Sequence, residues 1–212
     1  ALSTASDNNY YCANTSGVKL ELSNGTSGVK YELYKQTTFM TDTTLTADGG
    51  FVFDSTYKKG TYSVLAELPN GCADSMQNDI TIDEHSLPLD AQPINGDDTV
   101  ALGGTGTYSV PAISYADTIY WLLPAGASIS SGSGTTSVDV SFSSTVTGYD
   151  SVAVFGSNSC GLGDTAFYKV YIQPLPDSAG PVTGDTSLCE ESQGVTYAIP
   201  AVDHADSIRW TV

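Results

Sequence analysis

The sequence predicts an all-β fold built from tandem β-sandwich modules. Three observations lead to this prediction: abundant Thr, Val, Tyr and Gly beside sparse Lys, Glu and Met, apolar residues that alternate with polar ones, and a long internal repeat. β-Branched and aromatic residues favour strands, whereas Lys, Glu and Met favour helices. No segment shows the apolar periodicity of a helix.

In the first part of the chain, short alternating runs are separated by turn residues. Val18, Leu20 and Leu22 alternate with Lys19 and Glu21. This period of two is typical of half-buried antiparallel strands. Further runs of this kind lie at 29–33, 51–53, 62–66 and 80–82.

The second part of the chain continues the pattern. Its predicted strands lie at 107–110, 117–123, 137–142, 150–156 and 166–172. Segments rich in Gly, Ser and Pro stand between them, as expected of turns and loops.

An internal repeat defines the size of the modules. PINGDDTVALGGTGTYSVPAISYADTIYW at 93–121 aligns with PVTGDTSLCEESQGVTYAIPAVDHADSIRW at 181–210, at an offset of 88 residues that becomes 89 after one insertion. This period matches one immunoglobulin-like sandwich of about 100 residues. We therefore expect tandem immunoglobulin-like β-sandwich domains, the last one incomplete.

Two proline-bearing segments, 85–93 and 173–181, separate the modules. We expect domains at 1–86 and 87–176, followed by the first strands of a truncated domain at 177–212. Short linkers that contain Pro favour a semi-rigid join and a rod-like array. Since the last module holds about three of seven expected strands, we expect the natural chain to continue past Val212 or a neighbouring chain to complete the module.

The charge and the side-chain inventory exclude several functions. With 24 acidic against 7 basic side chains, the formal net charge is −17, which repels nucleic acid and anionic membrane surfaces. No apolar run reaches the roughly 18 to 20 residues of a membrane helix. His85 and His204 are the only histidines, and no nucleophile elbow, Cys/His pair, zinc spacing or phosphate loop accompanies them. We expect no enzyme activity, no cofactor, no nucleic-acid partner and no membrane insertion.

The four cysteines predict one disulfide. In a sandwich, the first strand and the loop between the last two strands lie at the same end, which would bring Cys12 to Cys72. That bond would close a loop of about 60 residues and add a few kcal/mol in the chain-entropy model; the alternative is two free thiols. We expect no bond between Cys160 and Cys189, because they lie at distant ends of different modules, and we expect Cys189 to pair beyond Val212.

Three aromatic residues are predicted to be structural. Trp121 and Trp210 occupy the position at which immunoglobulin-like folds keep a central core Trp. Tyr62, in a GTY sequence at the start of a late strand, resembles a tyrosine corner. We expect all three in the cores.

Motifs in every module resemble a known family. YSVPA at 108–112, LPAGASISSGSGTTSVDVSF at 123–142 and SNSCG at 157–161 are similar to the PKD-like, immunoglobulin-like repeats of secreted Bacteroidota proteins. The start of the third module, GPVTGDTSLC at 180–189, resembles the opening of the same repeat, and YYCANTSGVKLELSNGTSGVKYELYK at 10–35 resembles a companion immunoglobulin-like repeat. The resemblance implies a cell-adhesion stalk of a large surface adhesin, including those of gliding motility, exported by type IX secretion to the cell surface.

A three-residue pattern recurs at the aspartates. Nine of 18 Asp residues precede Ser or Thr and then Ala, Ile, Leu, Val, Met or Thr, against roughly two expected from the chain's own composition. The pattern resembles the O-glycosylation acceptor motif of Bacteroidota envelope proteins. The resemblance implies acceptors at Thr43, Ser55, Ser75, Thr99, Thr118, Ser151, Thr165, Ser178 and Ser207. The alternative is a strand entrance, in which a turn residue precedes an alternating run.

Other functions stay open at this point. The chain could be a carbohydrate-binding accessory module of a secreted enzyme, which an exposed row of aromatic residues would favour, or a subunit of a surface filament completed by a neighbouring chain. Expected partners are neighbouring domains of the same chain, with glycans or cell-surface components as further candidates. Calcium at the domain junctions is an alternative to solvated carboxylates, with candidate ligands at Asp90, Asp97, Asp98, Asp177 and Asp185.

Overall fold

The chain consists of strands and loops. The computed structural model describes residues 1–6, 8–143 and 147–211, and over these residues it contains no helix. Consequently no helix in the described ranges is long and apolar enough to cross a membrane. The predicted all-β fold class is confirmed, while Val212, the last residue of the predicted third module, lies outside the described residues.

Two compact units divide the chain. One contains Ala1–Pro88 together with Asn158–Leu162, and the other contains Leu89–Ser157 and Gly163–Val212. Each unit has its own cluster of buried apolar side chains. The predicted division into three domains stays a prediction.

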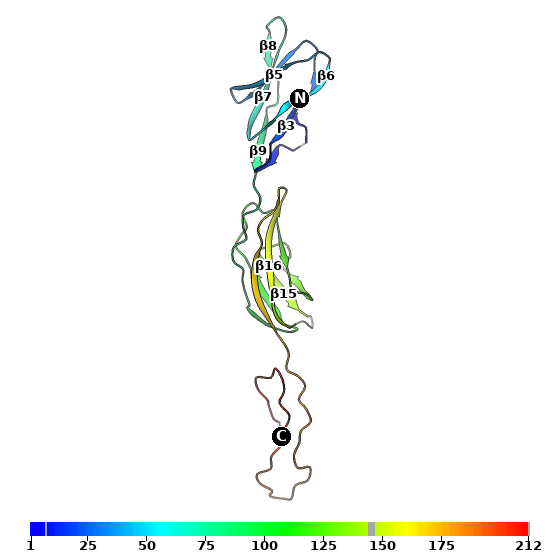
Figure 1. Cartoon of the computed structure of the whole chain (residues 1–212), viewed down its shortest axis with the longest axis vertical. Coiled ribbons are helices and arrows are strands. Elements are labelled where there is room, and N and C mark those ends of the chain that lie inside the picture. Colours follow the sequence, from blue (N-terminus) through cyan, green and yellow to red (C-terminus); the bar gives the residue numbers. More distant parts are fainter. Residues whose placement is uncertain (7, 144–146, 212) are drawn as a thin grey trace. The chain divides into compact units, whose positions relative to one another are not determined.

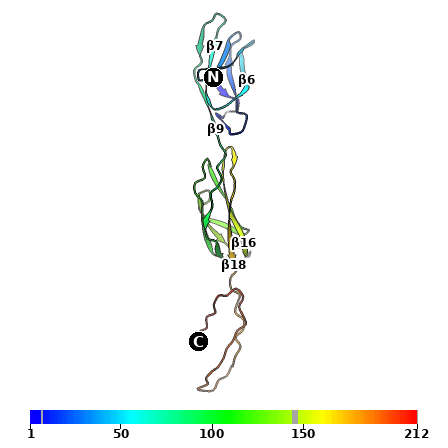
Figure 2. The same ribbon diagram turned by 60° about the vertical axis from the view of Figure 1, so that its left-hand side comes forward.

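Two sheets form the first unit (Figures 1 and 2). The smaller sheet has the order β1-β3-β6, with bounds Leu2–Thr4, Val18–Gly25 and Gly49–Tyr57. The larger sheet has the order β2-β9-β7-β4-β5, with β8 paired to β7. Its bounds are β2 Tyr10–Cys12, β4 Lys30–Lys35, β5 Thr38–Thr44, β7 Gly60–Glu67, β8 Ala73–Ser75 and β9 Ile80–His85.

Alternate residues of these strands form the first core. Leu20 and Leu22 of β3 pack in one cluster with Leu33 of β4 and Ile82 of β9, and all four side chains are buried. Full burial of each such side chain stabilises the fold by about 1.5–3 kcal/mol. Tyr62 lies in the same cluster and donates a hydrogen bond from its hydroxyl to the Lys58 carbonyl at 2.6 Å, as a tyrosine corner would.

The second unit is also a two-sheet sandwich. One sheet has the order β10-β12-β15-β14, with bounds Asn95–Gly96, Thr105–Ser109, Ser137–Phe142 and Ala127–Ser131. The other has the order β11-β18-β16-β13, with bounds Thr99–Ala101, Ala166–Gln173, Gly148–Asn158 and Thr118–Leu122. The short β17, Gly161–Leu162, pairs with β16. β11 runs parallel to β18, and β16 lies between β18 and β13 with antiparallel neighbours.

Trp121 closes the second core. It is 8% exposed, and its indole N–H donates to the Thr135 carbonyl at 2.9 Å. Tyr108, Val140 and Val154 are fully buried in the same cluster. The indole therefore finds a polar partner at the edge of an otherwise apolar core.

The sequence repeat has a counterpart in backbone geometry. Asn95 pairs with Ser109 on neighbouring strands, and Thr183 pairs with Ala198 in an isolated bridge. The two pairs are related by the offsets of 88 and 89 residues found in the sequence. The register of the first strand pair therefore recurs one repeat later.

The same tyrosine contact occurs in both copies. The Tyr108 hydroxyl donates to the Asp97 carbonyl at 3.1 Å, and the Tyr197 hydroxyl donates to the Asp185 carbonyl at 3.0 Å. The residue before each aspartate is a glycine, and a Cβ there would lie 2.3 Å from a ring carbon of the tyrosine. Only glycine fits at a backbone position that a ring approaches so closely.

Residues 177–211 differ from the prediction in two ways. No described residue after Gln173 belongs to a named strand, so the expected strands of the third module are absent. Trp210 is 51% exposed, so its assignment to a core was wrong. The groups that cover Trp121, such as the Thr135 carbonyl and Val154, follow it in the sequence, and the chain has two residues after Trp210.

The buried Tyr108 should make the second unit sensitive to alkali. Burial raises the pKa of Tyr108 from 10.0 to about 12. Because the unfolded chain ionises first, stability is unaffected below pH 10 and falls as pH rises from 10 to 12, by up to about 2 kcal/mol. We expect denaturant unfolding followed by Trp121 fluorescence to show this fall, and Tyr108→Phe to reduce it. A wild-type fall that Tyr108→Phe leaves unchanged would contradict the assignment.

Candidate functional site

The outer surface of the sheet β11-β18-β16-β13 is the strongest candidate site. Along β16, Val152 and Val154 enter the core. Successive side chains of a strand point to opposite faces, so Tyr149, Ala153 and Phe155 stand on the outer face. The strand thus carries apolar residues on both of its sides.

Neighbouring strands add rings to this outer face. Tyr149 pairs with Tyr171 of β18, and Phe155 pairs with Tyr120 of β13. The ring centroids lie 4.9 Å apart in the first pair and 5.4 Å apart in the second, where the planes are nearly parallel at 19°. We call Tyr120, Leu122, Tyr149, Phe155, Phe167 and Tyr171 the aromatic face.

Most of the aromatic face is open to solvent. Tyr149 and Phe167 are 70% and 71% exposed, and Leu122 is 52% exposed. Ala153 pairs with both Leu122 and Phe167 and is only 3% exposed. Its neighbours therefore cover it, and the face is continuous across the three strands.

One cation lies on this face. The Lys169 ammonium is 3.8 Å from the centroid of the Tyr149 ring, well within the range of a cation–π interaction. Lys169 also pairs with Ser151 across the sheet. These two residues place hydrogen-bonding groups between the rings.

The opposite sheet of the same unit has a different outer surface. Thr107 of β12 and Ser131 of β14 both donate hydroxyl hydrogen bonds to the Asp139 carboxylate of β15, at 2.8 and 2.7 Å. These bonds, first that of Ser131 and then that of Thr107, lower the pKa of Asp139. One sheet therefore displays hydroxyls and a carboxylate, and the other displays rings.

The larger sheet of the first unit displays charge. Lys30 contacts Glu32, and its Nζ lies 3.8 Å from Asp42 and 3.7 Å from Glu67. The hydrogen bond to Glu32 raises the pKa of Lys30 and lowers that of Glu32. Exposed ion pairs of this kind add little stability, but they keep the surface polar.

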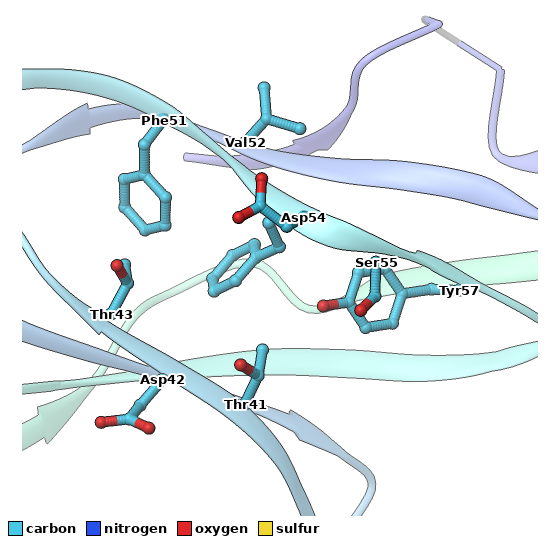
Figure 3. A pocket seen from close by; sticks show the side chains of 9 residues that line it. Thr41, Asp42, Thr43, Phe51, Val52, Asp54, Ser55 and Tyr57 are labelled. Carbon is cyan, nitrogen blue, oxygen red and sulfur yellow. The ribbon is translucent and has the colours of Figure 1, made fainter.

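A small polar pocket lies between β5 and β6 of the first unit (Figure 3). Its volume is about 100 Å³, and Asp42, Thr43, Asp54 and Ser55 are among its lining residues. Tyr57 also lines it, and burial raises the pKa of Tyr57, while Ser55 offsets part of this rise. Two predicted O-glycosylation sites, Thr43 and Ser55, therefore line the same pocket.

The nine predicted acceptors differ in exposure. Those that are exposed are Ser55, Ser75, Thr99, Thr118, Ser178 and Ser207, and those that are half-buried are Thr43, Ser151 and Thr165. In several motifs the following apolar residue enters a core, as Val100 does after Thr99. Strand alternation then directs the hydroxyl outward, so exposure is compatible with an acceptor and with a strand entrance alike.

The predicted Cys12–Cys72 bond was wrong. Cys12 is bonded to Cys160, with a Cα–Cα distance of 5.5 Å, and Cys72 and Cys189 are free. Cys160 lies in the segment 158–162 that belongs to the first unit, where the Asn158 amide donates to the Ser86 carbonyl at 2.7 Å. Cys160 and Cys189 are not bonded to each other, as expected.

Strand direction explains this error. β2 runs parallel to β9, so Cys12 lies beside His85 at the last residue of β9. Cys72 precedes β8, whose Ala73 pairs with Glu67 at the last residue of β7, whereas β9 pairs with the first residues of β7. The two cysteines therefore lie beyond opposite ends of β7, whose eight residues alone span about 24 Å, whereas a disulfide needs Cα atoms within about 7 Å.

The aromatic face escaped prediction although the sequence carries a signal for it. SVAVF at 151–155 and AFYKVY at 166–171 carry apolar residues at both odd-numbered and even-numbered positions, which point to opposite faces of a strand. Such runs indicate either a strand buried on both faces or an exposed apolar face, and the sequence does not distinguish them. Tyr120, Tyr149 and Tyr171 lie on the aromatic face. Tyr11 is instead buried and donates a hydrogen bond to Glu84 at 2.9 Å.

The aspartates considered as calcium ligands belong to no cluster that could hold a metal ion. Within residues 1–6, 8–143 and 147–211, no three His, Cys, Asp or Glu side chains lie close enough together to hold a metal ion. Asp97 instead accepts a hydrogen bond from the Thr107 backbone N–H at 3.1 Å. The expectation of no cofactor stays a prediction, and junctional calcium stays its alternative.

Comparison of sequences identifies a family. The sequence model described as PKD-like domain matches residues 87–170 and 175–212, which together make up more than half of the chain. The second match covers the segment in which the tyrosine contact recurs. No curated protein sequence matches the chain significantly.

Solved structures with similar folds have low sequence identity. The fibronectin(III)-like modules of Clostridium thermocellum CbhA share 10% identity, covering 82% of this chain and 95% of theirs, with a TM-score of 0.41. An ICAM-5 D1–D4 ectodomain fragment shares 12% identity, covering 94% of this chain and 60% of that fragment, with a TM-score of 0.49. A 1.5-MDa bacterial ice-binding adhesin shares 14% identity, covering 87% and 67%, with a TM-score of 0.45.

Thiol labelling tests the cysteine assignment. Alkylation of the unreduced, denatured chain should modify Cys72 and Cys189, and alkylation after reduction should modify all four cysteines. Peptide mass spectrometry identifies the sites. Modification of Cys12 or Cys160 before reduction would contradict the assignment.

Proposed function

Because the chain belongs to the PKD-like domain family, we propose that it is a stalk segment of a large secreted surface adhesin. Modules of such a stalk act in series and hold a binding tip away from the cell. PKD-like and immunoglobulin-like domains are typically non-catalytic, and the proposed role is mechanical. The observation that carries the proposal is the recurrence of one strand register and one tyrosine contact at the repeat offset.

The disulfide supports an extracellular location. Disulfides persist in oxidising compartments and are rare in the cytosol. The two bonded cysteines, Cys12 and Cys160, are 148 residues apart in the sequence. We propose secretion to the cell surface, by the type IX route that the resemblance implies, for the protein that contains this segment.

The same bond has a mechanical consequence for a stalk. When the chain is pulled from its ends, force passes from Cys12 to Cys160 through the sulfur–sulfur bond. Residues between the two cysteines cannot extend while the bond is intact. Most strands of both units lie within that interval, so the bond protects them from unfolding under load.

O-glycosylation would add protection against proteases. A glycan is bulky and solvating, and its acceptor must face water. Six of the nine proposed acceptors are exposed and none is buried.

Single-molecule extension tests the protective bond. In the oxidised chain, the stretch between Cys12 and Cys160 should contribute no length. Reduction should release roughly 500 Å of additional contour length, since 148 residues each span about 3.3–3.6 Å when extended. Cys160→Ser should behave like the reduced chain and Cys72→Ser like the oxidised one. Equal contour lengths before and after reduction would contradict the proposal.

Glycopeptide mapping tests the modification. In protein from the native source, we expect sugar on the exposed acceptors, such as Ser55, Ser75 and Ser178, at higher occupancy than on the half-buried Thr43 and Thr165. The intact mass should exceed 22.1 kDa. A native chain of unmodified mass would overturn the glycosylation proposal and leave the stalk proposal standing.

A further inference from the structure

We propose that the aromatic face of β13, β16 and β18 is a binding site for an uncharged polysaccharide. This site lies within one unit and does not depend on the stalk function. It would serve an adhesin and an accessory module of a secreted enzyme equally well.

The exposure of the face is the first argument. Four of its side chains, Tyr120, Leu122, Tyr149 and Phe167, are each close to half exposed or more. Contiguous apolar surfaces rimmed by polar residues mark binding sites. The opposite sheet of the same sandwich, with Thr107, Ser131 and Asp139 outside, shows that the fold does not require rings on its surface.

Charge decides which ligand fits. In a chain of net charge −17, the outward positions of β11, β13, β16 and β18, all within the described residues, carry one charged side chain, Lys169. A second copy of the chain would be repelled by the remaining charge, and so would a polyanion. An uncharged ligand is not repelled by the negative charge of the chain. At these described positions the face carries no acidic side chain and one basic one, so a ligand does not need a charge to bind there.

The side chains match the chemistry of a sugar. Aromatic rings contact the apolar C–H groups of a pyranose by dispersion and by removal of apolar surface from water. Tyrosine combines such a ring with a hydroxyl. The hydroxyls of Tyr120, Tyr149 and Ser151 and the ammonium of Lys169 can exchange hydrogen bonds with sugar hydroxyls beside the rings.

The length of the face favours a polymer over a single sugar. The Tyr149–Tyr171 and Phe155–Tyr120 pairs are six residues apart along β16, which corresponds to about 20 Å. Phe167 and Leu122 lie in the row between them, beside Ala153. An extended polysaccharide chain could therefore contact rings in three rows, with the row of Ser151 and Lys169 between the first and the second.

One predicted O-glycosylation site, Ser151, lies on the same surface. Ser151 follows Tyr149 by two residues and pairs with Lys169, so a sugar attached to Ser151 would cover the rings. The test therefore uses the unmodified recombinant chain, whose mass of 22.1 kDa verifies that the face is open.

Retention on insoluble polysaccharide tests the site. The full chain is mixed with cellulose, chitin, xylan or starch granules, and the free protein is measured at about 0.05 M and about 0.5 M salt, which changes electrostatic screening strongly. We expect retention on at least one polymer, unchanged by salt. Phe167→Ala and Tyr149→Ala should each weaken it about tenfold or more, as truncation of an interface ring commonly does.

Two control substitutions show whether retention depends on the aromatic face. Phe39→Ala removes a ring that is 50% exposed in the first unit, and Thr107→Ala alters the opposite sheet; both should bind like the wild type. Failure to bind all four polymers would overturn the proposal. It would also be overturned by retention that the Phe167 and Tyr149 variants leave unchanged, by retention lost at high salt, or by self-association that those variants abolish. None of these results bears on the stalk proposal.

Discussion

Much of the second unit depends on strict alternation along β16. This strand pairs with β13 on one side and β18 on the other, and its even-numbered Val152 and Val154 are completely buried. The odd-numbered Tyr149, Ala153 and Phe155 are thereby fixed on the outer face. Because a shift of one residue would exchange the two faces, the core and the aromatic face are determined together.

The two sheets of the second unit have outer surfaces of different chemistry. The sheet that contains β12 and β15 has an apolar inner side and a hydroxyl-rich outer side, which suits a soluble stalk. The sheet that contains β16 is apolar on both sides, which an isolated stalk module does not need. The proposed polysaccharide site on a structural module accounts for both observations.

Sequence patterns predicted the long strands other than β5, but not the shortest ones. Runs such as those at 18–22 and 137–142 have enough residues to show a period of two. β1, β2, β10 and β11 have two or three residues, too few for any period, and the mostly exposed β5 has no apolar side.

The cysteine pairing and the aromatic face could be found only from the three-dimensional structure. Cys12 lies close enough to Cys160 to form the bond because β2 runs parallel to β9. A strand of three residues has no sequence pattern that indicates its direction. The apolar run at 151–155 predicted a strand. Whether Phe155 is buried or exposed to solvent depends on what packs against that side of the sheet. Trp210 shows the same limit, since its burial would require covering residues that follow it in the repeat.

A paired substitution on β16 tests the central claim that this strand separates a buried side from a displayed one. Val152→Asp should destabilise the second unit by about 4 kcal/mol or more, because it buries an unpaired charge. Ser151→Asp, on the outer side and opposite Lys169, should leave the denaturant midpoint within experimental error of the wild type. Equal tolerance of the two substitutions, or greater damage from Ser151→Asp, would contradict the account.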